Sequence, residues 1–308
     1  SYTLTGLSAG ADYRYAVSSY VKTADGKLIF SDKTIVDTFT VPAKVKGLTY
    51  STRSDKNITL KWNSVNGATG YSVYRKVSGK YKLVKNVTGT SYNITGLKAV
   101  TTYNFKVVAY KKRGSKKLTG AETTANIMTT PSAVKNLKVT ARSSGSITLA
   151  WDKVSNADGY MVYRYSGKNA KLIKVISSMS RSRVVFVSSG LKGGTTYTYK
   201  VVAYKSVRGS RVQNPGTKIT AVTTPATPLV TVSAQKGQAT ISWRKASGAG
   251  GYIVYMSTSQ KGRYSRVATI NNGSTTKYVK KNLKKGKTYY FKVVSYKKLG
   301  GKTYMSQY

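Results

Sequence analysis

The chain repeats itself with a period of about 90 residues, and this repetition constrains the fold more than any single motif does. Tryptophan, tyrosine and proline mark equivalent positions, which are Trp62, Trp151 and Trp243, then Tyr71, Tyr160 and Tyr252, then Tyr13, Tyr103, Tyr197 and Tyr289, then Pro42, Pro131 and Pro225. We therefore divide the 308 residues into an N-terminal segment (1–41), repeat one (42–130), repeat two (131–224) and repeat three (225–308). Each full repeat has the length of a small domain.

Both ends of the chain fall inside a repeat. The N-terminal segment matches the back half of a repeat, so we expect it to be the C-terminal part of a truncated domain. Repeat three ends sooner after Tyr296 than repeat one ends after the equivalent Tyr110, and we expect its last strand to be incomplete. Two explanations stay open: the chain is a window on a longer repetitive protein, or chains complete each other's open sheets by strand addition.

Polar and apolar residues alternate in short runs within each repeat. Residues 147–151, 160–163 and 197–204 all show this period of two, which is typical of half-buried strands. Glycine, asparagine and serine clusters such as Asp158-Gly159 separate the runs, and no segment of helical length carries an apolar stripe. Seven or so short strands in about 90 residues predict a two-sheet sandwich, so the expected fold class is all-β.

The repeated anchors resemble tandem fibronectin type III domains of a secreted or cell-surface bacterial protein. Repeat two carries the pattern most fully, with Ile147-Thr148-Leu149-x-Trp151, Gly159-Tyr160-x-Val162-Tyr163 and Tyr197-x-Tyr199-x-Val201. A leucine followed six residues later by a tyrosine, as in Leu191 and Tyr197, resembles the tyrosine corner of this family, in which the phenol bonds to nearby backbone. The resemblance covers the whole chain and implies immunoglobulin-like β-sandwiches. It does not imply one function, because such sandwiches host many.

Composition excludes most catalytic chemistry. The chain has 53 Lys and Arg, 8 Asp and Glu, no histidine and no cysteine, so it lacks the usual general base, the thiol nucleophile and two common zinc ligands. Residues 159–308 contain no carboxylate side chain, and a hydrolase that needs two carboxylates cannot lie there. We therefore expect no catalytic residue, no cofactor and no metal site.

Strand alternation predicts a repeated surface of tyrosine and lysine. If Phe105 and Val107 point into the core, Lys106 and Tyr110 point out, and Tyr74 on the neighbouring strand faces the same side. Tyrosine rings can stack on sugars and lysines can pair with anions; alternatively, these are ordinary exposed strand residues. The candidate ligand-binding residues are Tyr74, Lys106 and Tyr110 in repeat one, Tyr163, Lys200 and Tyr204 in repeat two, and Tyr255, Lys292 and Tyr296 in repeat three.

The net charge of +45 favours an anionic partner. The N-terminal segment carries equal numbers of basic and acidic side chains, whereas the three repeats carry net charges of +15, +14 and +16. We expect an anionic or neutral polysaccharide or a cell-wall polymer as partner. Nucleic acid would bind only nonspecifically, because no recognition helix or RNA-binding signature is present.

Linkers and hydropathy bear on how the repeats are displayed. Thr129-Thr130-Pro131 is short and contains proline, so we expect the sandwiches to form an extended rod. No apolar run is long enough to span a bilayer, and the first residues do not read as a signal peptide. We expect an extracellular location, secreted or attached to a cell surface, without membrane insertion.

These observations favour a non-catalytic spacer that holds other domains of a longer chain and adheres weakly to anionic or carbohydrate polymers at a cell surface. One alternative is an accessory region of a secreted glycoside or peptidoglycan hydrolase. Another is a filament-forming subunit in which residues 1–41 mediate self-association by strand exchange.

Overall fold

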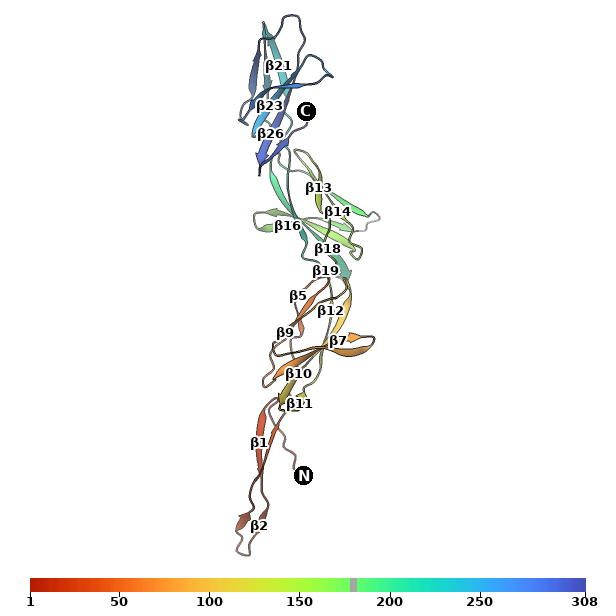
Figure 1. Ribbon diagram of the computed structural model, residues 1–308, viewed down its shortest axis with the longest axis vertical. Helices are drawn as coiled ribbons and strands as arrows, with labels where there is room; N and C mark the ends of the chain where they lie inside the picture. The colour runs from red at the N-terminus through yellow and green to blue at the C-terminus, as the bar shows by residue number, and fades with distance from the viewer. Residues whose placement is uncertain (178–181) are drawn as a thin grey trace. The chain divides into compact units, whose positions relative to one another are not determined.

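The computed structural model confirms the all-β fold class. It describes residues 1–177 and 182–308, and in these residues all regular secondary structure is strand and none is helix (Figure 1). The described chain divides into two compact units, one formed by residues 1–132 and 207–212 and the other by residues 133–206 and 213–308. The predicted strands at 147–151, 160–163 and 197–204 are all confirmed.

The N-terminal segment forms two small antiparallel ladders and no sandwich. The first ladder pairs Asp12–Val17 with Thr34–Phe39, and the second pairs Tyr20–Lys22 with Leu28–Phe30. Several large apolar side chains, among them Val21 and Phe30, stay exposed because no second sheet covers them. The strands are β1 (Asp12–Val17), β2 (Tyr20–Lys22), β3 (Leu28–Phe30) and β4 (Thr34–Phe39).

Repeat one is a sandwich of two antiparallel sheets. One sheet has the strand order β5-β6-β9, and the other has the order β11-β10-β7-β8 with β12 also paired to β10. The strands are β5 (Thr49–Arg53), β6 (Ile58–Lys61), β7 (Gly70–Val77), β8 (Lys80–Val87), β9 (Ser91–Ile94), β10 (Thr102–Arg113), β11 (Lys116–Thr119) and β12 (Thr123–Met128).

Repeat two follows the same plan. Its sheets have the orders β13-β14-β17 and β16-β15-β18-β19, and β20 pairs with β18 as β12 pairs with β10. The strands are β13 (Lys138–Arg142), β14 (Ile147–Asp152), β15 (Gly159–Ser166), β16 (Asn169–Ser177), β17 (Arg183–Ser188), β18 (Thr196–Val207), β19 (Ser210–Gln213) and β20 (Thr217–Val222).

Repeat three has the orders β21-β22-β25 and β24-β23-β26-β27. In the part of the chain that the structure describes, β26 has no partner in the place that β12 and β20 take in the other repeats. The strands are β21 (Val230–Gln235), β22 (Gln238–Trp243), β23 (Gly251–Ser257), β24 (Ser265–Ile270), β25 (Lys277–Lys281), β26 (Tyr290–Leu299) and β27 (Lys302–Met305).

Each repeat has its own hydrophobic core between its two sheets. In repeat two, Leu149 and Trp151 from one sheet pack against Val162 and Val201 from the other. The tryptophan of each repeat lies against the tyrosine nine residues later, at the start of the next strand, with ring centroids 5.4 Å apart for Trp151 and Tyr160. Alternating residues fill these cores because successive side chains of a strand point to opposite faces.

The tyrosine corner that the sequence predicts is present in every copy. The hydroxyl of Tyr103 accepts a hydrogen bond from the backbone N–H of Lys98 at 2.8 Å, and Tyr197 accepts one from Lys192 at the same distance. Tyr13 and Tyr289 do the same at 2.7 and 3.1 Å. These bonds satisfy backbone groups at the bend before β1, β10, β18 and β26 and fix where each of those strands begins.

Two junctions within the compact units depend on paired glycines. Gly10 and Gly67 bring the N-terminal segment against repeat one, and Gly194 and Gly248 bring repeat two against repeat three. All four have φ between +59° and +77°, where a side chain is strained. A Cβ on Gly67 would overlap the carbonyl oxygen of Gly10, so a larger residue cannot approach as closely.

A buried lysine also joins the N-terminal segment to repeat one. The Lys111 ammonium donates to the Gly10 carbonyl oxygen and to Asp12 Oδ2, both at 2.7 Å, and Lys111 is only 7% exposed. The equivalent lysine of repeat two, Lys205, instead bonds to Asp158 of its own repeat at 2.6 Å. The hydrogen bonds from Lys205 and from the Ser206 N–H lower the pKa of the Asp158 carboxyl.

Candidate ligand-binding surface

The strand register places a tyrosine and a lysine side by side in all three repeats. Lys106 on β10 is opposite Tyr74 on β7, and Lys200 on β18 is opposite Tyr163 on β15. Lys292 on β26 is opposite Tyr255 on β23, which completes the set. The side chains share the outer face of the larger sheet because the intervening residues fill the core.

A β-bulge lies next to each of these tyrosines. The register between β7 and β8 shifts between Val73 and Tyr74, and the same shift separates Val162 from Tyr163 and Val254 from Tyr255. A bulge bends the strand and re-aims the side chain beside it, and bulges are frequent at binding sites. The three tyrosines therefore share the same backbone setting.

The lysines lie over aromatic rings instead of extending into solvent. Lys106 Nζ is 4.6 Å from the centroid of the Tyr74 ring and 4.8 Å from that of Tyr81. In repeat two, Lys200 Nζ is 5.0 Å from the centroid of Tyr163. Such cation–π contacts contribute about 0.5–1 kcal/mol at exposed sites and restrict the side chain, so each ammonium is held in a defined place.

Repeat three uses different rings around its lysine. Lys292 Nζ lies 4.1 Å from the centroid of Tyr264 and 5.1 Å from that of Tyr308, and Tyr255 packs edge to face on Tyr308. The ring of Tyr308 thus contacts both the Lys292 ammonium and Tyr255, the cross-strand neighbour of this lysine. Alternation along the strands could not reveal this, because Tyr264 and Tyr308 lie outside the strands.

The expectation that the second tyrosine of each set faces solvent is wrong for Tyr204 and Tyr296. These side chains are 4% and 5% exposed, and the equivalent Tyr110 is half-buried. Each ring lies over a glycine directly opposite it in register, and a Cβ on Gly159 would be 2.7 Å from the Tyr204 hydroxyl oxygen. The ring covers the bare backbone of the neighbouring strand, which buries apolar surface and removes it from any ligand.

The remaining seven candidates are half-buried. They are Tyr74, Lys106, Tyr110, Tyr163, Lys200, Tyr255 and Lys292. Ligand binding by these residues stays a prediction. The strand pattern does not single out the rings of Tyr81, Tyr165, Tyr264 and Tyr308, which the structure brings to the same lysines or their neighbours.

The charge around the lysine differs between repeats one and two. Lys106 forms an ion pair with Glu122, which comes just before β12. In repeat two the position of Glu122 is taken by Gly216, and β20 places Lys218 directly opposite Lys200. Lys218 was missed in the sequence analysis, although the alternation of β20 would have placed it on this face.

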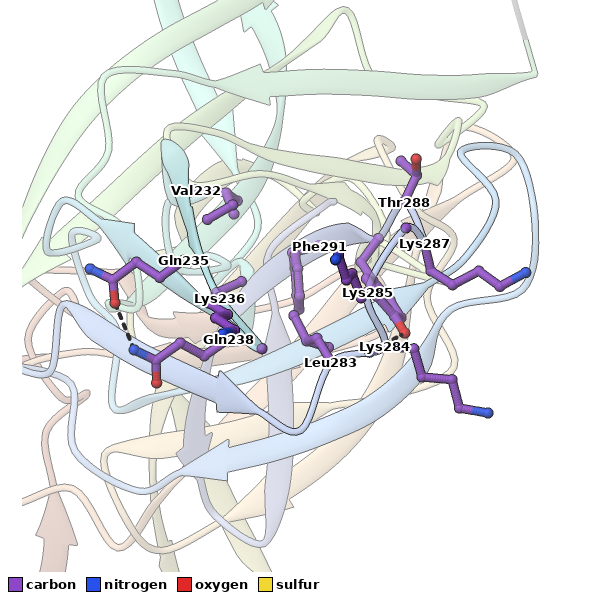
Figure 2. Close-up of a pocket in the computed structure, with 15 residues that line it drawn as sticks. Val232, Gln235, Lys236, Gln238, Leu283, Lys284, Lys285, Lys287, Thr288 and Phe291 are labelled. Carbon is purple, nitrogen blue, oxygen red and sulfur yellow. Dashed lines mark hydrogen bonds between the residues drawn. The ribbon is translucent and has the colours of Figure 1, made fainter.

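A cavity in repeat three is lined by the β21–β22 hairpin, by residues 283–289 and by Phe291 at the start of β26 (Figure 2). Its volume is about 840 Å³, and its floor includes Leu283 and Phe291 while Lys284, Lys285 and Lys287 stand at its rim. Thr288 and Phe291 are equivalent to residues of β10 that pair with β12, so the cavity reaches the beginning of the β26 edge that lacks this partner.

The arrangement of acidic side chains and the secondary structure bear on the class of site. In the described ranges, no three Asp, Glu, His or Cys side chains gather closely enough to hold a metal ion. The same residues include no helix with the length and hydropathy needed to cross a membrane.

A family model described as fibronectin type III domain matches residues 43–125 and 132–217. The chain is 28% identical over 282 residues to exoglucanase B of Cellulomonas fimi, which covers 82% of this chain and 24% of that protein. It is 34% identical over 181 residues to chitinase A1 of Niallia circulans, covering 54% and 24%, and 26% identical to receptor-type tyrosine-protein phosphatase eta of Mus musculus, covering 82% and 19%. The chain thus spans about a quarter or less of these relatives.

Among solved structures, the chain is similar to the FN1-FN3 domains of chicken CNTN1 at 19% identity and a TM-score of 0.27, covering 82% of this chain and 93% of that one. A two-domain segment of chicken tenascin matches at 22% identity and a TM-score of 0.33, covering 58% and 99%.

Proposed function

The chain belongs to the fibronectin type III family, as its repeats predict, and from this premise we propose that it is a non-catalytic segment that spaces other domains and adheres weakly to anionic or carbohydrate polymers. The observation that carries the proposal is the recurrence, in every full repeat, of a half-buried lysine fixed over tyrosine rings on the outer sheet face. Several weak sites on one chain can together hold it on a polymer, because binding at one site raises the effective concentration of the next.

Three observations support a non-catalytic role. Fibronectin type III repeats occur in relatives named as an exoglucanase and a chitinase, of which this chain matches only about a quarter. The sequence contains neither histidine nor cysteine. Its acids number 8 in 308 residues and none lies beyond residue 158. General acid–base and thiol chemistry therefore have few groups to use.

These relatives favour one setting for the segment. We propose that it accompanies the catalytic domain of a secreted glycoside hydrolase and keeps that domain near its polymer. The relative named as a receptor-type phosphatase supports an extracellular or cell-surface place for repeats of this kind. Sequencing of the full-length gene tests the setting, because a catalytic domain in the same reading frame supports it and a chain of repeats alone supports a free-standing spacer.

The adhesive part is tested by retention of the purified chain on insoluble neutral glycans, acidic polysaccharides and isolated cell walls, each at low and at high salt. Retention on anionic polymers that falls as salt rises is the expected result, because exposed charges are screened. Replacement of Tyr74, Tyr163 and Tyr255 by alanine weakens any retention that persists at high salt. A wild-type chain that binds none of these polymers at low salt contradicts the proposal.

Self-assembly is a second candidate, favoured by one observation. In the described residues β26 of repeat three lacks the strand partner that β12 and β20 supply in the other repeats, and the N-terminal segment carries exposed apolar strands such as β2 and β3. An added strand could pair with such an edge. Light scattering tests this: particle mass that grows with concentration supports it, and a monomer at all concentrations excludes it.

A further inference from the structure

Repeat two presents two lysines directly opposite each other on its outer sheet face. Lys200 on β18 and Lys218 on β20 are register partners, so their side chains leave the sheet side by side. Like charges opposite each other in an antiparallel pair destabilise the sheet. An anion that comes between the two ammonium groups therefore stabilises the folded repeat.

In the part of the chain that the structure describes, no carboxylate forms an ion pair with Lys200 or Lys218. In repeat one, Lys106 is neutralised by Glu122, but Gly216 stands at the equivalent place in repeat two, and residues 159–308 contain no Asp or Glu. The two acids of repeat two are engaged elsewhere: Asp158 accepts hydrogen bonds from Lys205 and Ser206, and Asp152 accepts one from Asn136. The lysine pair is thus left with unbalanced charge.

Two tyrosines hold the lysine pair in place. Lys200 Nζ lies 5.0 Å from the centroid of Tyr163, and Lys218 Nζ lies 4.9 Å from the centroid of Tyr165. Tyr163 and Tyr165 are two residues apart on β15 and therefore share the same face. Because the side chains are already ordered, an incoming anion does not have to restrict them, and preorganisation of this kind favours binding.

We propose that Lys200 and Lys218 form a site for one acidic group, a carboxylate or sulfate, of an acidic polysaccharide. The sugar ring lies against the edges of Tyr163 and Tyr165, and the half-buried Val175 and the exposed Leu172 extend the apolar surface beside it. This site rests on the proposed adhesive function and locates its strongest anionic contact in repeat two.

An acidic polysaccharide fits this face better than a nucleic acid does. Single-stranded nucleic acids bind through bases stacked on open aromatic rings. Here an ammonium group already covers a face of Tyr163 and another covers a face of Tyr165. A carboxylate or sulfate needs only the two ammonium groups, which remain accessible at the sheet surface.

Binding of the full chain to polygalacturonate, dextran sulfate, neutral dextran and a single-stranded DNA oligonucleotide tests the site. The variants are Lys200→Gln and Lys218→Glu, with Lys138→Glu as the matched charge reversal on the other sheet of repeat two. We expect Lys218→Glu to weaken polygalacturonate or dextran sulfate binding by about 10-fold and Lys200→Gln by about 3-fold, whereas Lys138→Glu changes it by less than about 2-fold.

A second readout separates binding from folding. Lys218→Glu converts the like-charge pair into an ion pair similar to that of Lys106 and Glu122, so its thermal midpoint rises while its binding falls. Equal loss of binding in Lys218→Glu and Lys138→Glu overturns the site, as does tighter binding of the oligonucleotide than of either acidic polysaccharide. Binding of the wild-type chain to neutral dextran alone overturns the site, and failure to bind any of the three polysaccharides overturns the proposed adhesive function itself.

Discussion

The two junctions within the compact units use the same backbone contact but different charges. Gly10 against Gly67 and Gly194 against Gly248 occupy equivalent positions, and both pairs allow two backbone segments to approach without side chains between them. In the described residues only the first junction adds ion pairs, from Lys111 and Arg113 to Asp12. At the second junction Thr196 takes the place of Asp12, and repeat three contains no acid. Both junctions thus require close backbone packing, and only the first is also stabilised by charge.

The lysine after the tyrosine that covers a glycine, Lys111 in repeat one and Lys205 in repeat two, also has different partners in different repeats. Lys111 reaches back to the N-terminal segment, whereas its equivalent Lys205 turns to Asp158 within repeat two. The position is lysine in all three repeats, and its partner is decided by where the nearest acid lies. A repeated residue therefore need not have a repeated role.

The largest effect is expected from Gly248→Ala. Its φ of +77° strains any side chain, and the new methyl would overlap the Gly193 carbonyl oxygen at the junction. Gly237→Ala is the matched control, since Gly237 has a φ of +68° with nothing within 4 Å. We expect about 1 kcal/mol of destabilisation for the control and about 1–3 kcal/mol more for Gly248→Ala, measured by chemical denaturation. Equal losses would show that the close approach is unimportant.

Lys111→Met is expected to loosen the first junction and leave the second unchanged. The substitution keeps the apolar stem but removes the hydrogen bonds to Gly10 and Asp12. Because Asp12 is 57% exposed, we expect a loss of about 1–2 kcal/mol, less than for a fully buried pair. Hydrogen exchange followed by mass spectrometry should show faster exchange at residues 10–17. Unchanged exchange there would show that the ion pair does not stabilise the first junction.

Acid should weaken the Lys205 contact through Asp158. The pKa of this carboxyl is lowered in the folded protein, so its contribution to stability is present above the unfolded pKa and is lost as pH falls through the lower folded value. Because Asp158 is partly exposed, the effect is small. In Asp158→Asn, the unfolding midpoint of repeat two should change less with pH below about pH 4 than in the wild type. An identical pH profile would contradict this role.

Salt gives the smallest predicted difference. Screening should slightly speed hydrogen exchange around Gly10 and leave it unchanged around Gly248, because only the first junction contains an ion pair. The effect is limited because Lys111 is buried. Equal salt responses at both junctions would mean that the ion pair does not contribute there.

Much of the fold could be predicted because the same strand pattern recurs independently in each repeat. The alternation at 197–204 and the leucine–tyrosine spacing before it fixed strand β18 and its tyrosine corner. The pairing of Tyr163 with Lys200 followed from assigning faces to two neighbouring strands. Periodicity of two is a local property, and a sequence reports it directly.

What could not be predicted depends on contacts across strands. Alternation assigns Tyr204 to the outer face but says nothing of its tilt, and the signal for its burial was Gly159, which leaves room for the ring. Glu122 and Lys218 change the charge around equivalent lysines from loops and strands far along the chain. Their effect appears only once the register of β18 and β20 is known.

The placement of one tryptophan in each sandwich core has a spectroscopic consequence. Trp62, Trp151 and Trp243 are at most 5% exposed, and each has a tyrosine ring at 5.2–5.4 Å. Each repeat thus contains a single indole fluorophore whose emission shifts when its own core opens. Replacing two of the three by phenylalanine leaves one reporter, so the melting of any chosen repeat can be followed by fluorescence inside the intact chain.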